Sequence, residues 1–371
     1  MHETTSVHRD RLAAVRRGLV ARGAVAAVFG LSSNLRYLTG FTDEPGERLL
    51  LLIVPSDGEA TMIVPALYAD QVEAHRPAAT IRTWADGEDP ARILRELADR
   101  LKATPGNLLV DDSLWATFVL PLQEAFPERS FGLVSEVMTQ LRVCKGPEEI
   151  GAMRKAGEIA DSALEDALGS PIVGLTERQL AGRIESAMLD GGAGSVAFET
   201  LVASGPNGAL PHYRAGSRAI QPNDVVVLDF GCRFEGYCSD MTRTVVCGEP
   251  TAEVGNVYDA VRRAHREATQ AVRLGIEAQG VDRAARRVLT EDGYGDRFTH
   301  RTGHGVGLDI HEPPYIVEGN ERLLQEGMAF SIEPGAYLPG LFGVRLEDVV
   351  VVTKDGARSM TEASRALRIV E

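Results

Sequence analysis

The chain has 371 residues, 44% of them hydrophobic, and a formal net charge of −14 at pH 7. Since single hydrophobic cores stop growing at about 250–300 residues, this length favours two globular domains over one. The acidic balance, without a basic run or tail, excludes the electrostatic footprint of a protein that binds nucleic acid or an anionic membrane. Small molecules are therefore the expected partners.

The N-terminal stretch is charged and helix-like and lacks the apolar core of a signal peptide. An uninterrupted apolar run of about 18 residues, which a membrane span needs, does not occur. We therefore expect a cytoplasmic protein. The four cysteines, Cys144, Cys232, Cys238 and Cys247, form no CxxC pair, so neither a zinc ribbon nor a disulfide framework is indicated.

Residues 1–140 are predicted to form an α/β domain, because helical and strand-like patterns alternate along them. The predicted helices cover residues 8–22 and 89–103. The predicted strands cover residues 24–30, 48–55, 60–65 and 107–112.

The second domain, residues 141–371, is predicted to open with helices. Pro147 suits a first helical position, and "TERQ" at residues 176–179 has the form of a capping box, with Gly191 as the stop. Thr251 is a candidate cap for an amphipathic run to Leu274. Strands with hairpin turns lie between and after these helices, which indicates an α+β domain.

The segment VVVLDFGCRFEGYCSDMTRTVV, residues 225–246, predicts a buried hairpin that carries two acids. If its turn lies at residues 233–236, Asp229 faces Asp240 directly across the strands. Cross-strand neighbours have Cβ atoms about 5 Å apart, and like charges at that distance repel. Such a pair needs a proton or a cation between its members.

A second hairpin, residues 330–352, repeats this arrangement, since folding about Gly340 places Glu333 opposite Glu347. Between the hairpins, a glycine-rich loop carries three histidines: His300, His304 and His311. Four carboxylates and an imidazole suit Mn²⁺, Co²⁺, Fe²⁺ or Zn²⁺ rather than a thiolate-bound metal. The stretch "GHGVG" lacks the G-x-G-x-x-G form and does not indicate a dinucleotide site.

These residues carry a resemblance to a known family. The second domain resembles the pita-bread metallopeptidases, which include methionine aminopeptidase, prolidase and aminopeptidase P. The family's ligand order is matched within "LDFG", "SDMTRT", "GHGVGLDIHE", "SIEPG" and "VRLEDVVVV" by Asp229, Asp240, His304, Glu333 and Glu347. The resemblance implies two divalent cations about 3.5–4 Å apart, Mn²⁺ in the first place with Co²⁺ or Zn²⁺ as alternatives.

The resemblance also implies roles for neighbouring residues. Glu333 is the candidate to accept the proton of the attacking water, and His212 and His311 are the candidates to stabilise the developing oxyanion. His300 is expected to line the substrate cleft. Arg345 and Thr242 are expected to hold the metal ligands by hydrogen bonds.

The N-terminal domain separates the branches of the family. Methionine aminopeptidases generally lack it, whereas the Xaa-Pro peptidases carry one, and "SSNLRYLTGF" at residues 32–41 resembles its characteristic stretch. The expected protein is thus a homodimeric metallo-exopeptidase that cleaves Xaa-Pro bonds in short proline-containing peptides, foremost an Xaa-Pro dipeptidase. The alternatives are an aminopeptidase P acting on longer peptides, a metal-independent creatinase-type C–N hydrolase and a non-catalytic binding module.

The chain departs from the family at a position where a cation is expected. A dipeptidase needs a cation to bind the carboxylate on the product side of the cleaved bond. Prolidases often place an arginine after the second histidine, where this chain reads "HEPPYI" with Tyr315. Tyr315 and Arg48, the latter on a loop of the first domain, are the candidates to bind substrate instead. A surface arginine beside Glu47 is the competing interpretation.

Overall fold

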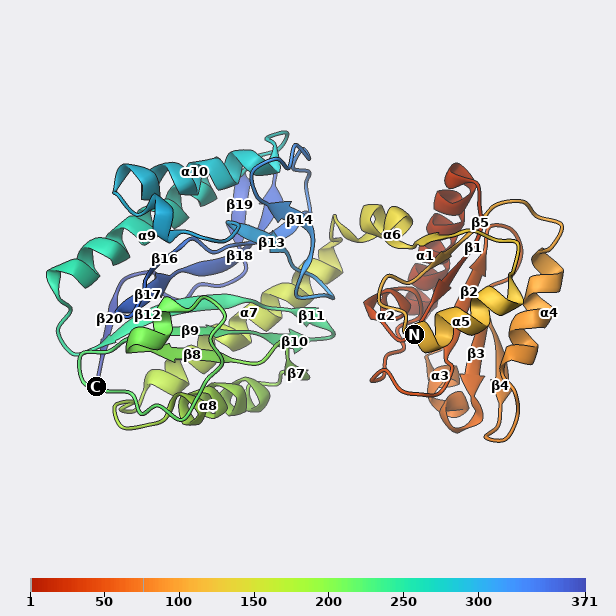
Figure 1. Ribbon diagram of the computed structural model, residues 1–371, viewed down its shortest axis with the longest axis horizontal. Helices are drawn as coiled ribbons and strands as arrows, with labels where there is room; N and C mark the ends of the chain where they lie inside the picture. Colours follow the sequence, from red (N-terminus) through yellow and green to blue (C-terminus); the bar gives the residue numbers. More distant parts are fainter. Residues whose placement is uncertain (1, 76) are drawn as a thin grey trace. The chain divides into compact units, whose positions relative to one another are not determined.

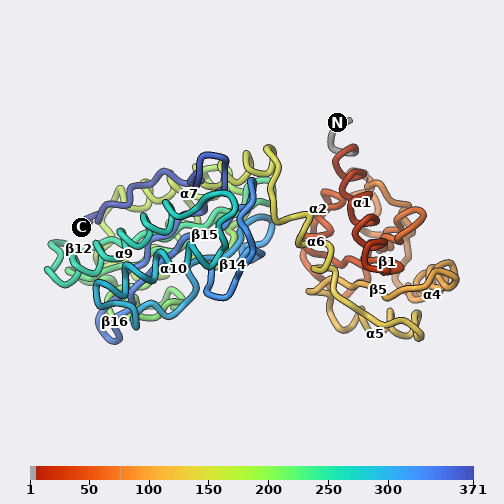
Figure 2. The backbone as a smooth tube through the Cα atoms, turned by 90° about the horizontal axis from the view of Figure 1, so that it is seen from above, coloured from red at the N-terminus to blue at the C-terminus, as the bar shows by residue number. Residues whose placement is uncertain are grey.

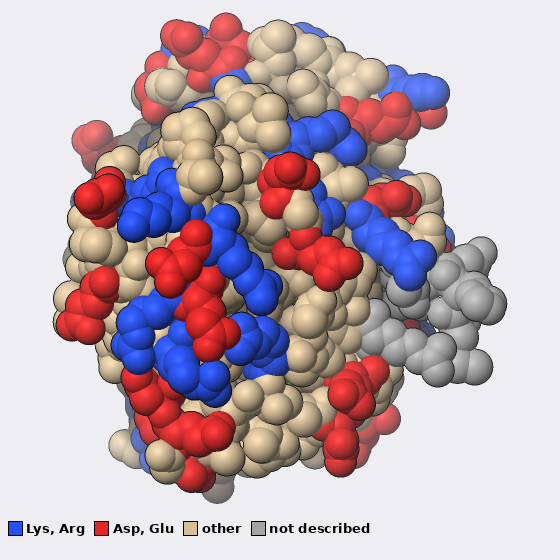
Figure 3. All heavy atoms as spheres, turned by 90° about the vertical axis from the view of Figure 1, so that its right-hand side faces the viewer, with Lys and Arg blue, Asp and Glu red and all other residues tan. Residues whose placement is uncertain are grey.

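The computed structural model describes residues 2–75 and 77–371, and the chain divides into two compact units that meet between Arg142 and Val143 (Figure 1). Among the helices described, none combines the length and apolarity that crossing a membrane would require. Figure 3 shows acidic and basic side chains interspersed over one face of the molecule.

The first unit is built on a mixed six-stranded sheet in the order β4-β3-β2-β1-β5-β6. Strand β1 pairs antiparallel with β2 and parallel with β5. The strands are β1 (Ala24–Phe29), β2 (Leu51–Pro55), β3 (Thr61–Pro65), β4 (Thr80–Trp84), β5 (Asn107–Val110) and β6 (Phe131–Leu133). The helices are α1 (His2–Arg22), α2 (Ser33–Thr39), α3 (Ala69–Ala74), α4 (Ala91–Leu101), α5 (Ala116–Ala125) and α6 (Ser135–Arg142).

Continuous burial explains why the first strands could be recognised from the sequence. Every residue of β1, β2 and β3 is buried, so both faces of these strands are covered and the apolar runs are unbroken. The elements that were not predicted from the sequence are α2, α3, α5, α6, β4 and β6. In β4 only Trp84 is buried, so the strand lacks an apolar signal.

The second unit contains four long helices, α7 (Pro147–Leu168), α8 (Glu177–Asp190), α9 (Ala252–Ala271) and α10 (Ala278–Glu291). The Glu149 carboxylate accepts a hydrogen bond from the Gly146 N–H at the start of α7. Thr176 and Gln179 form the predicted capping box of α8. Thr251 caps α9, which ends at Ala271 rather than Leu274.

The strands of the second unit form a large sheet in the order β14-β13-β15-β18-β12-β9-β8, with β19 beside β18 and β20 beside β12. Those that build the site are β9 (Val225–Phe230), β12 (Met241–Cys247), β13 (Gly303–Gly305), β14 (Glu312–Ile316), β15 (Ala329–Ile332) and β18 (Glu347–Thr353). The others are β7 (Ser195–Val196), β8 (Leu201–Ser204), β10 (Cys232–Phe234), β11 (Tyr237–Cys238), β16 (Gly335–Leu338), β17 (Phe342–Arg345), β19 (Gly356–Ser359) and β20 (Arg368–Val370).

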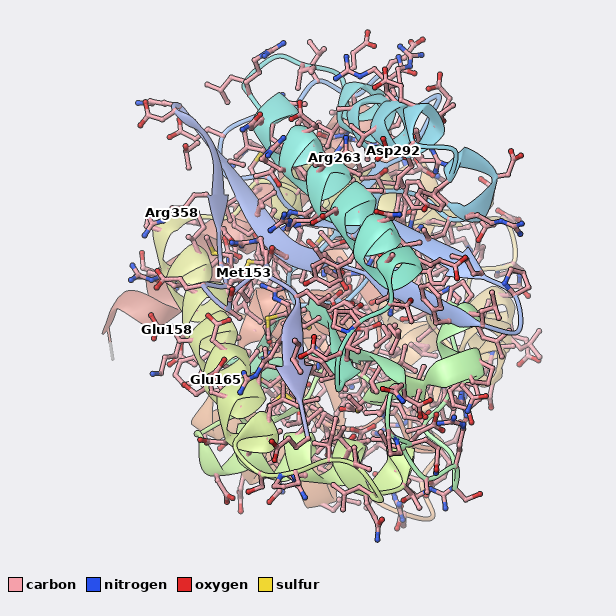
Figure 4. All side chains as sticks on the ribbon, turned by 90° about the vertical axis from the view of Figure 1, so that its left-hand side faces the viewer. Met153, Glu158, Glu165, Arg263, Asp292 and Arg358 are labelled. Atoms are coloured by element: carbon pink, nitrogen blue, oxygen red, sulfur yellow. The ribbon has the colours of Figure 1, made fainter. Side chains whose placement is uncertain are left out.

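The helices pack on this sheet in two pairs. Side chains of α7 and α8 share one buried apolar cluster with β8, β9 and β12. Side chains of α9 and α10 share another with β15, β17 and β18. Helices α9 and α10 run side by side (Figure 2), and the Arg263–Asp292 ion pair joins α9 to the end of α10 (Figure 4).

The register of the first acidic hairpin differs from the prediction. Asp229 pairs with Thr242, not with Asp240. The turn is centred on Glu235 and Gly236, both with positive φ, which is the backbone of the two-residue type I′ turn that matches strand twist. The prediction centred the turn one residue too early. A shift of two positions keeps side chains on the same face, so both acids still lie on one side of the sheet.

The second hairpin turns about Gly340 as predicted. Gly335 pairs with Arg345 in β16 and β17, and Ile332 pairs with Asp348 in β15 and β18. The same register continues through both strand pairs. It places Glu333, which directly follows β15, across from Glu347, the first residue of β18.

Candidate metal centre

The five predicted metal ligands line a single cavity of about 410 Å³ in the second unit. They lie in, or directly next to, five neighbouring strands of the large sheet. Asp229 is in β9, Asp240 precedes β12, His304 is in β13, Glu333 follows β15 and Glu347 begins β18. Adjacent strands therefore bring together residues from distant parts of the chain.

Strand alternation explains why Asp229 reaches this cavity. Its neighbours Leu228 and Phe230 are fully buried in the apolar cluster beneath α7 and α8. Since successive side chains of a strand point to opposite faces, Asp229 points to the other face, where the cavity lies. The apolar residues of β9 thus stay in the core, while Asp229 places its carboxylate in the cavity on the opposite face.

Two glycines allow His304 to occupy its position. A Cβ atom on Gly303 would come 1.8 Å from the Ser331 carbonyl oxygen, and one on Gly305 would come 2.3 Å from the Glu312 carbonyl oxygen. The backbone of β13 therefore packs between β14 and β15 more closely than residues with side chains permit. The glycine-rich pattern serves strand packing around the histidine.

Potential metal donors converge around the His304 ring. Its Nε2 lies 3.3 Å from Glu333 Oε1 and 3.6 Å from Asp240 Oδ2. Donor atoms of Asp240, His304 and Glu347 all lie within 4.8 Å of one another, and all three residues are buried. Carboxylates and a neutral imidazole so close together form a set of the kind that binds divalent cations.

Burial dominates the electrostatics of this cavity. It raises the pKa of Glu333 to about 7, and with the neighbouring carboxylates it raises the pKa values of Asp240 and Glu347 well above their usual ranges. Burial also lowers the pKa of His304 to about 3, which leaves its imidazole neutral, as a metal ligand requires.

The residues present fit divalent cations. Asp229 Oδ1 is buried and has no hydrogen-bond partner in the described part of the chain, while its other oxygen accepts from Arg345. An unpaired buried carboxylate oxygen is costly, and a cation satisfies it. A cation would also offset the repulsion between neighbouring carboxylates, which adds to burial in raising the pKa values of Asp240 and Glu347.

Arg345 and Thr242 contact ligands as predicted from the resemblance. Arg345 Nη2 donates to Asp229 Oδ2 at 2.6 Å, and Thr242 Oγ1 donates to Glu347 Oε2 at 2.6 Å. Arg345 Nε also donates to Thr242 Oγ1 at 3.0 Å. The two residues thus link carboxylates of β9 and β18.

The predicted substrate-side histidines have different surroundings. His212 and His311 are exposed and line the cavity, and the His311 ring centroid is 4.2 Å from that of His304. Burial, followed by the charge of Arg301, lowers the pKa of His311. His300 also lines the cavity, but its Nε2 lies 2.8 Å from the Tyr337 hydroxyl and its Nδ1 lies 2.8 Å from the Arg301 carbonyl oxygen.

Sequence reasoning overlooked Tyr337 and Arg301. The Tyr337 hydroxyl accepts from Arg345 Nη1 at 3.0 Å and contacts His300, so it joins the two. Arg301 lines the cavity. Its place between two predicted site histidines in "THRTGHG" was the available signal for Arg301, whereas no local pattern marks Tyr337.

The two remaining predicted substrate-binding residues are Tyr315, in the second unit, and Arg48, in the first. Tyr315 is in β14 opposite His304 in register, and its ring lies under the Arg301 guanidinium. Arg48 belongs to the first unit, where it makes two hydrogen bonds to Asp86 and one to Glu47. A role of either residue in substrate binding stays a prediction.

Comparison with known proteins gives full-length relatives. The chain is 36% identical to an "Xaa-Pro dipeptidase" of Lactobacillus delbrueckii subsp. lactis, covering 95% of this chain and 96% of the relative. It is 39% identical to a "Probable dipeptidase PepE" of Mycobacterium tuberculosis, covering 98% and 97%. A prolidase structure from Thermococcus sibiricus is 41% identical and superposes with a TM-score of 0.94, covering 98% and 99%.

Family assignments agree with these relatives and with both predicted fold classes. Residues 11–144 match the Creatinase/Prolidase N-terminal domain, the α/β unit with the mixed sheet. Residues 151–354 match metallopeptidase family M24, the pita-bread unit that contains the carboxylate cavity. The chain therefore belongs to the M24 metallopeptidases that carry a creatinase-type N-terminal domain.

Proposed function

We propose that this metallopeptidase hydrolyses Xaa-Pro dipeptides, with Asp229, Asp240, His304, Glu333 and Glu347 as ligands of two divalent cations. The observation that carries the proposal is the convergence of all five residues on one cavity, which also contains His212 and His311. The full-length similarity to an Xaa-Pro dipeptidase and a prolidase supports the choice of substrate.

Bound cations would supply Lewis acidity toward the attacking water and the scissile carbonyl. The residues of the chain perform the remaining steps. The Glu333 carboxylate accepts the proton of the water and passes it to the prolyl nitrogen, which has no hydrogen and must gain one to leave. His212 and His311 donate hydrogen bonds to the developing oxyanion.

The acids of the cavity explain exopeptidase action. A free α-amino group is cationic and is attracted by a carboxylate-rich site, whereas an acylated nitrogen is not. A cavity of this size suits small substrates better than folded chains. Manganese as the cation, a homodimer and a cytoplasmic location complete the proposal and rest on the family resemblance and the sequence pattern.

Hydrolysis of Ala-Pro, Ala-Pro-Ala and Ala-Ala by metal-free protein, before and after addition of Mn²⁺, tests the function. We expect cleavage of Ala-Pro after metal addition, and its loss with a chelator. Glu347→Gln should abolish it, whereas Glu321→Gln, at an exposed position, should not.

Other results of this assay would support one of the alternative functions. Faster cleavage of Ala-Pro-Ala would identify an aminopeptidase P instead of a dipeptidase. Activity that persists with chelator would favour a creatinase-type hydrolase. Metal-loaded protein that cleaves none of the peptides would contradict the proposal and leave the non-catalytic binding module.

A further inference from the structure

Arg301 offers open hydrogen-bond donors to the metal cavity. Two arginines line it, Arg301 and Arg345. The Arg345 guanidinium is occupied by Asp229, Thr242, Tyr337 and the Pro211 carbonyl oxygen. For Arg301, in contrast, no carboxylate or carbonyl of the described residues makes a hydrogen bond or ion pair with the guanidinium.

Tyr315 holds this free cation in place. The Arg301 guanidinium carbon lies 4.6 Å from the centroid of the Tyr315 ring, which is the geometry of a cation–π contact. An aromatic face orients a guanidinium and leaves its edge donors free, so they remain available to a ligand.

The chemistry of a dipeptide requires a cation at such a place. Three bonds separate the scissile carbon of an Xaa-Pro dipeptide from its carboxylate carbon, so the two atoms are at most about 4 Å apart. The carboxylate of a bound dipeptide must therefore lie within the same cavity as the cleaved bond. A planar guanidinium matches a carboxylate with two parallel hydrogen bonds.

We propose that Arg301, seated on the ring of Tyr315, binds the C-terminal carboxylate of the substrate and so selects dipeptides over longer peptides. The proposal rests on the function proposed above and names the residue that determines substrate length. A longer peptide presents a neutral amide at this point and forfeits the charged hydrogen bonds. The cation that the sequence lacks at position 315 is supplied from position 301.

Comparison of Ala-Pro with Ala-Pro-amide, which differs only in the charge of its C-terminus, tests Arg301. For the wild type with Mn²⁺, we expect kcat/KM to be about 10- to 100-fold higher for Ala-Pro, the range of a charged hydrogen bond. Arg301→Leu should remove this difference mainly through KM for Ala-Pro and leave the amide nearly unchanged. Arg301→Lys keeps the positive charge but loses the paired N–H donors of the guanidinium. It should retain part of the preference for Ala-Pro over Ala-Pro-amide.

Arg297→Leu is the matched control, because Arg297 is exposed and does not line the cavity. It should keep the wild-type ratio. If Arg301→Leu lowers kcat/KM equally for both substrates, or leaves both unchanged, the proposal is overturned while Xaa-Pro hydrolysis stands.

A binding measurement tests recognition of the carboxylate separately from hydrolysis. Calorimetry with reduced-amide Ala-Pro, which has no cleavable bond, and with its C-terminal carboxamide reports recognition without turnover. Wild type should prefer the carboxylate by the same factor, and Arg301→Leu should not. Equal affinities for the wild type would refute the role of Arg301 even if the protein cleaved no peptide.

Discussion

Arg345 makes hydrogen bonds to several residues of the metal cavity at once. Its guanidinium contacts the Asp229 carboxylate, the Thr242 hydroxyl and the Tyr337 hydroxyl, and through Tyr337 it is linked to His300. Burial raises the pKa of Asp229, and the positive charge of Arg345 opposes this effect. The arginine therefore favours the ionised form of Asp229 that a metal ion needs.

Replacement of Arg345 tests this support. Arg345→Leu should weaken Mn²⁺ binding about 10- to 100-fold, the usual effect of losing a partner of a metal ligand. Tyr337→Phe removes a single hydrogen bond of the guanidinium and should have a smaller effect. Isothermal titration of Mn²⁺ into metal-free protein measures both, and circular dichroism verifies folding. Unchanged affinity in Arg345→Leu would show that Asp229 needs no such partner.

Strand β18 has the metal cavity on one face and a buried network of ion pairs on the other. Glu347 points to the metal cavity, and the next residue, Asp348, points away from it and is fully buried. Asp348 accepts hydrogen bonds from Arg243, Thr361 and Arg365. Burial alone would raise its pKa, but Arg243, His265 and Arg365 outweigh burial and hold the pKa well below the usual range.

Asp348→Asn should therefore destabilise the second unit by about 3–5 kcal/mol, because it leaves the buried Arg243 guanidinium without its counter-charge. Urea unfolding followed by circular dichroism measures this loss. Asp355→Asn, in the exposed turn after β18, is the matched control and should change the free energy of unfolding by less than about 0.5 kcal/mol. A loss in Asp348→Asn no greater than in the control would contradict a stabilising role of the buried network.

The metal cavity also affects the stability of the whole molecule. Burial raises the pKa of Glu333 from 4.5 to about 7, and the pKa values of Asp229, Asp240 and Glu347 are raised as well. Without metal, the folded protein thus holds protons that the unfolded chain has already released between these pH values. These carboxyl groups therefore contribute stability that is lost as the pH rises through this window, whereas His300 and His304, with pKa values lowered from 6.5 to about 3, contribute in the opposite sense below pH 6.5.

Calorimetric melting at about pH 7 and about pH 9, where unfolded histidines are already neutral, with and without Mn²⁺, tests this linkage. The metal-free protein should melt at a lower temperature at the higher pH. The stabilisation by Mn²⁺ should be larger there, because cations bind the deprotonated carboxylates of the folded state. A metal-free melting temperature that rises with pH, or a metal effect independent of pH, would show that the carboxylates are not the linked groups.

Local patterns in the sequence determined the elements of the site. The apolar run of β9, the cap residues of α8 and α9 and the turn at Gly340 depend on neighbouring residues, so they can be recognised without a structure. The family resemblance then named the ligands. The tertiary structure decided the register at the Glu235–Gly236 turn, the contacts of Tyr337 with Arg345 and His300, and the position of Arg301 on Tyr315. These features depend on which strands become neighbours and at what offset, and that follows from packing of the whole sheet rather than from any single segment.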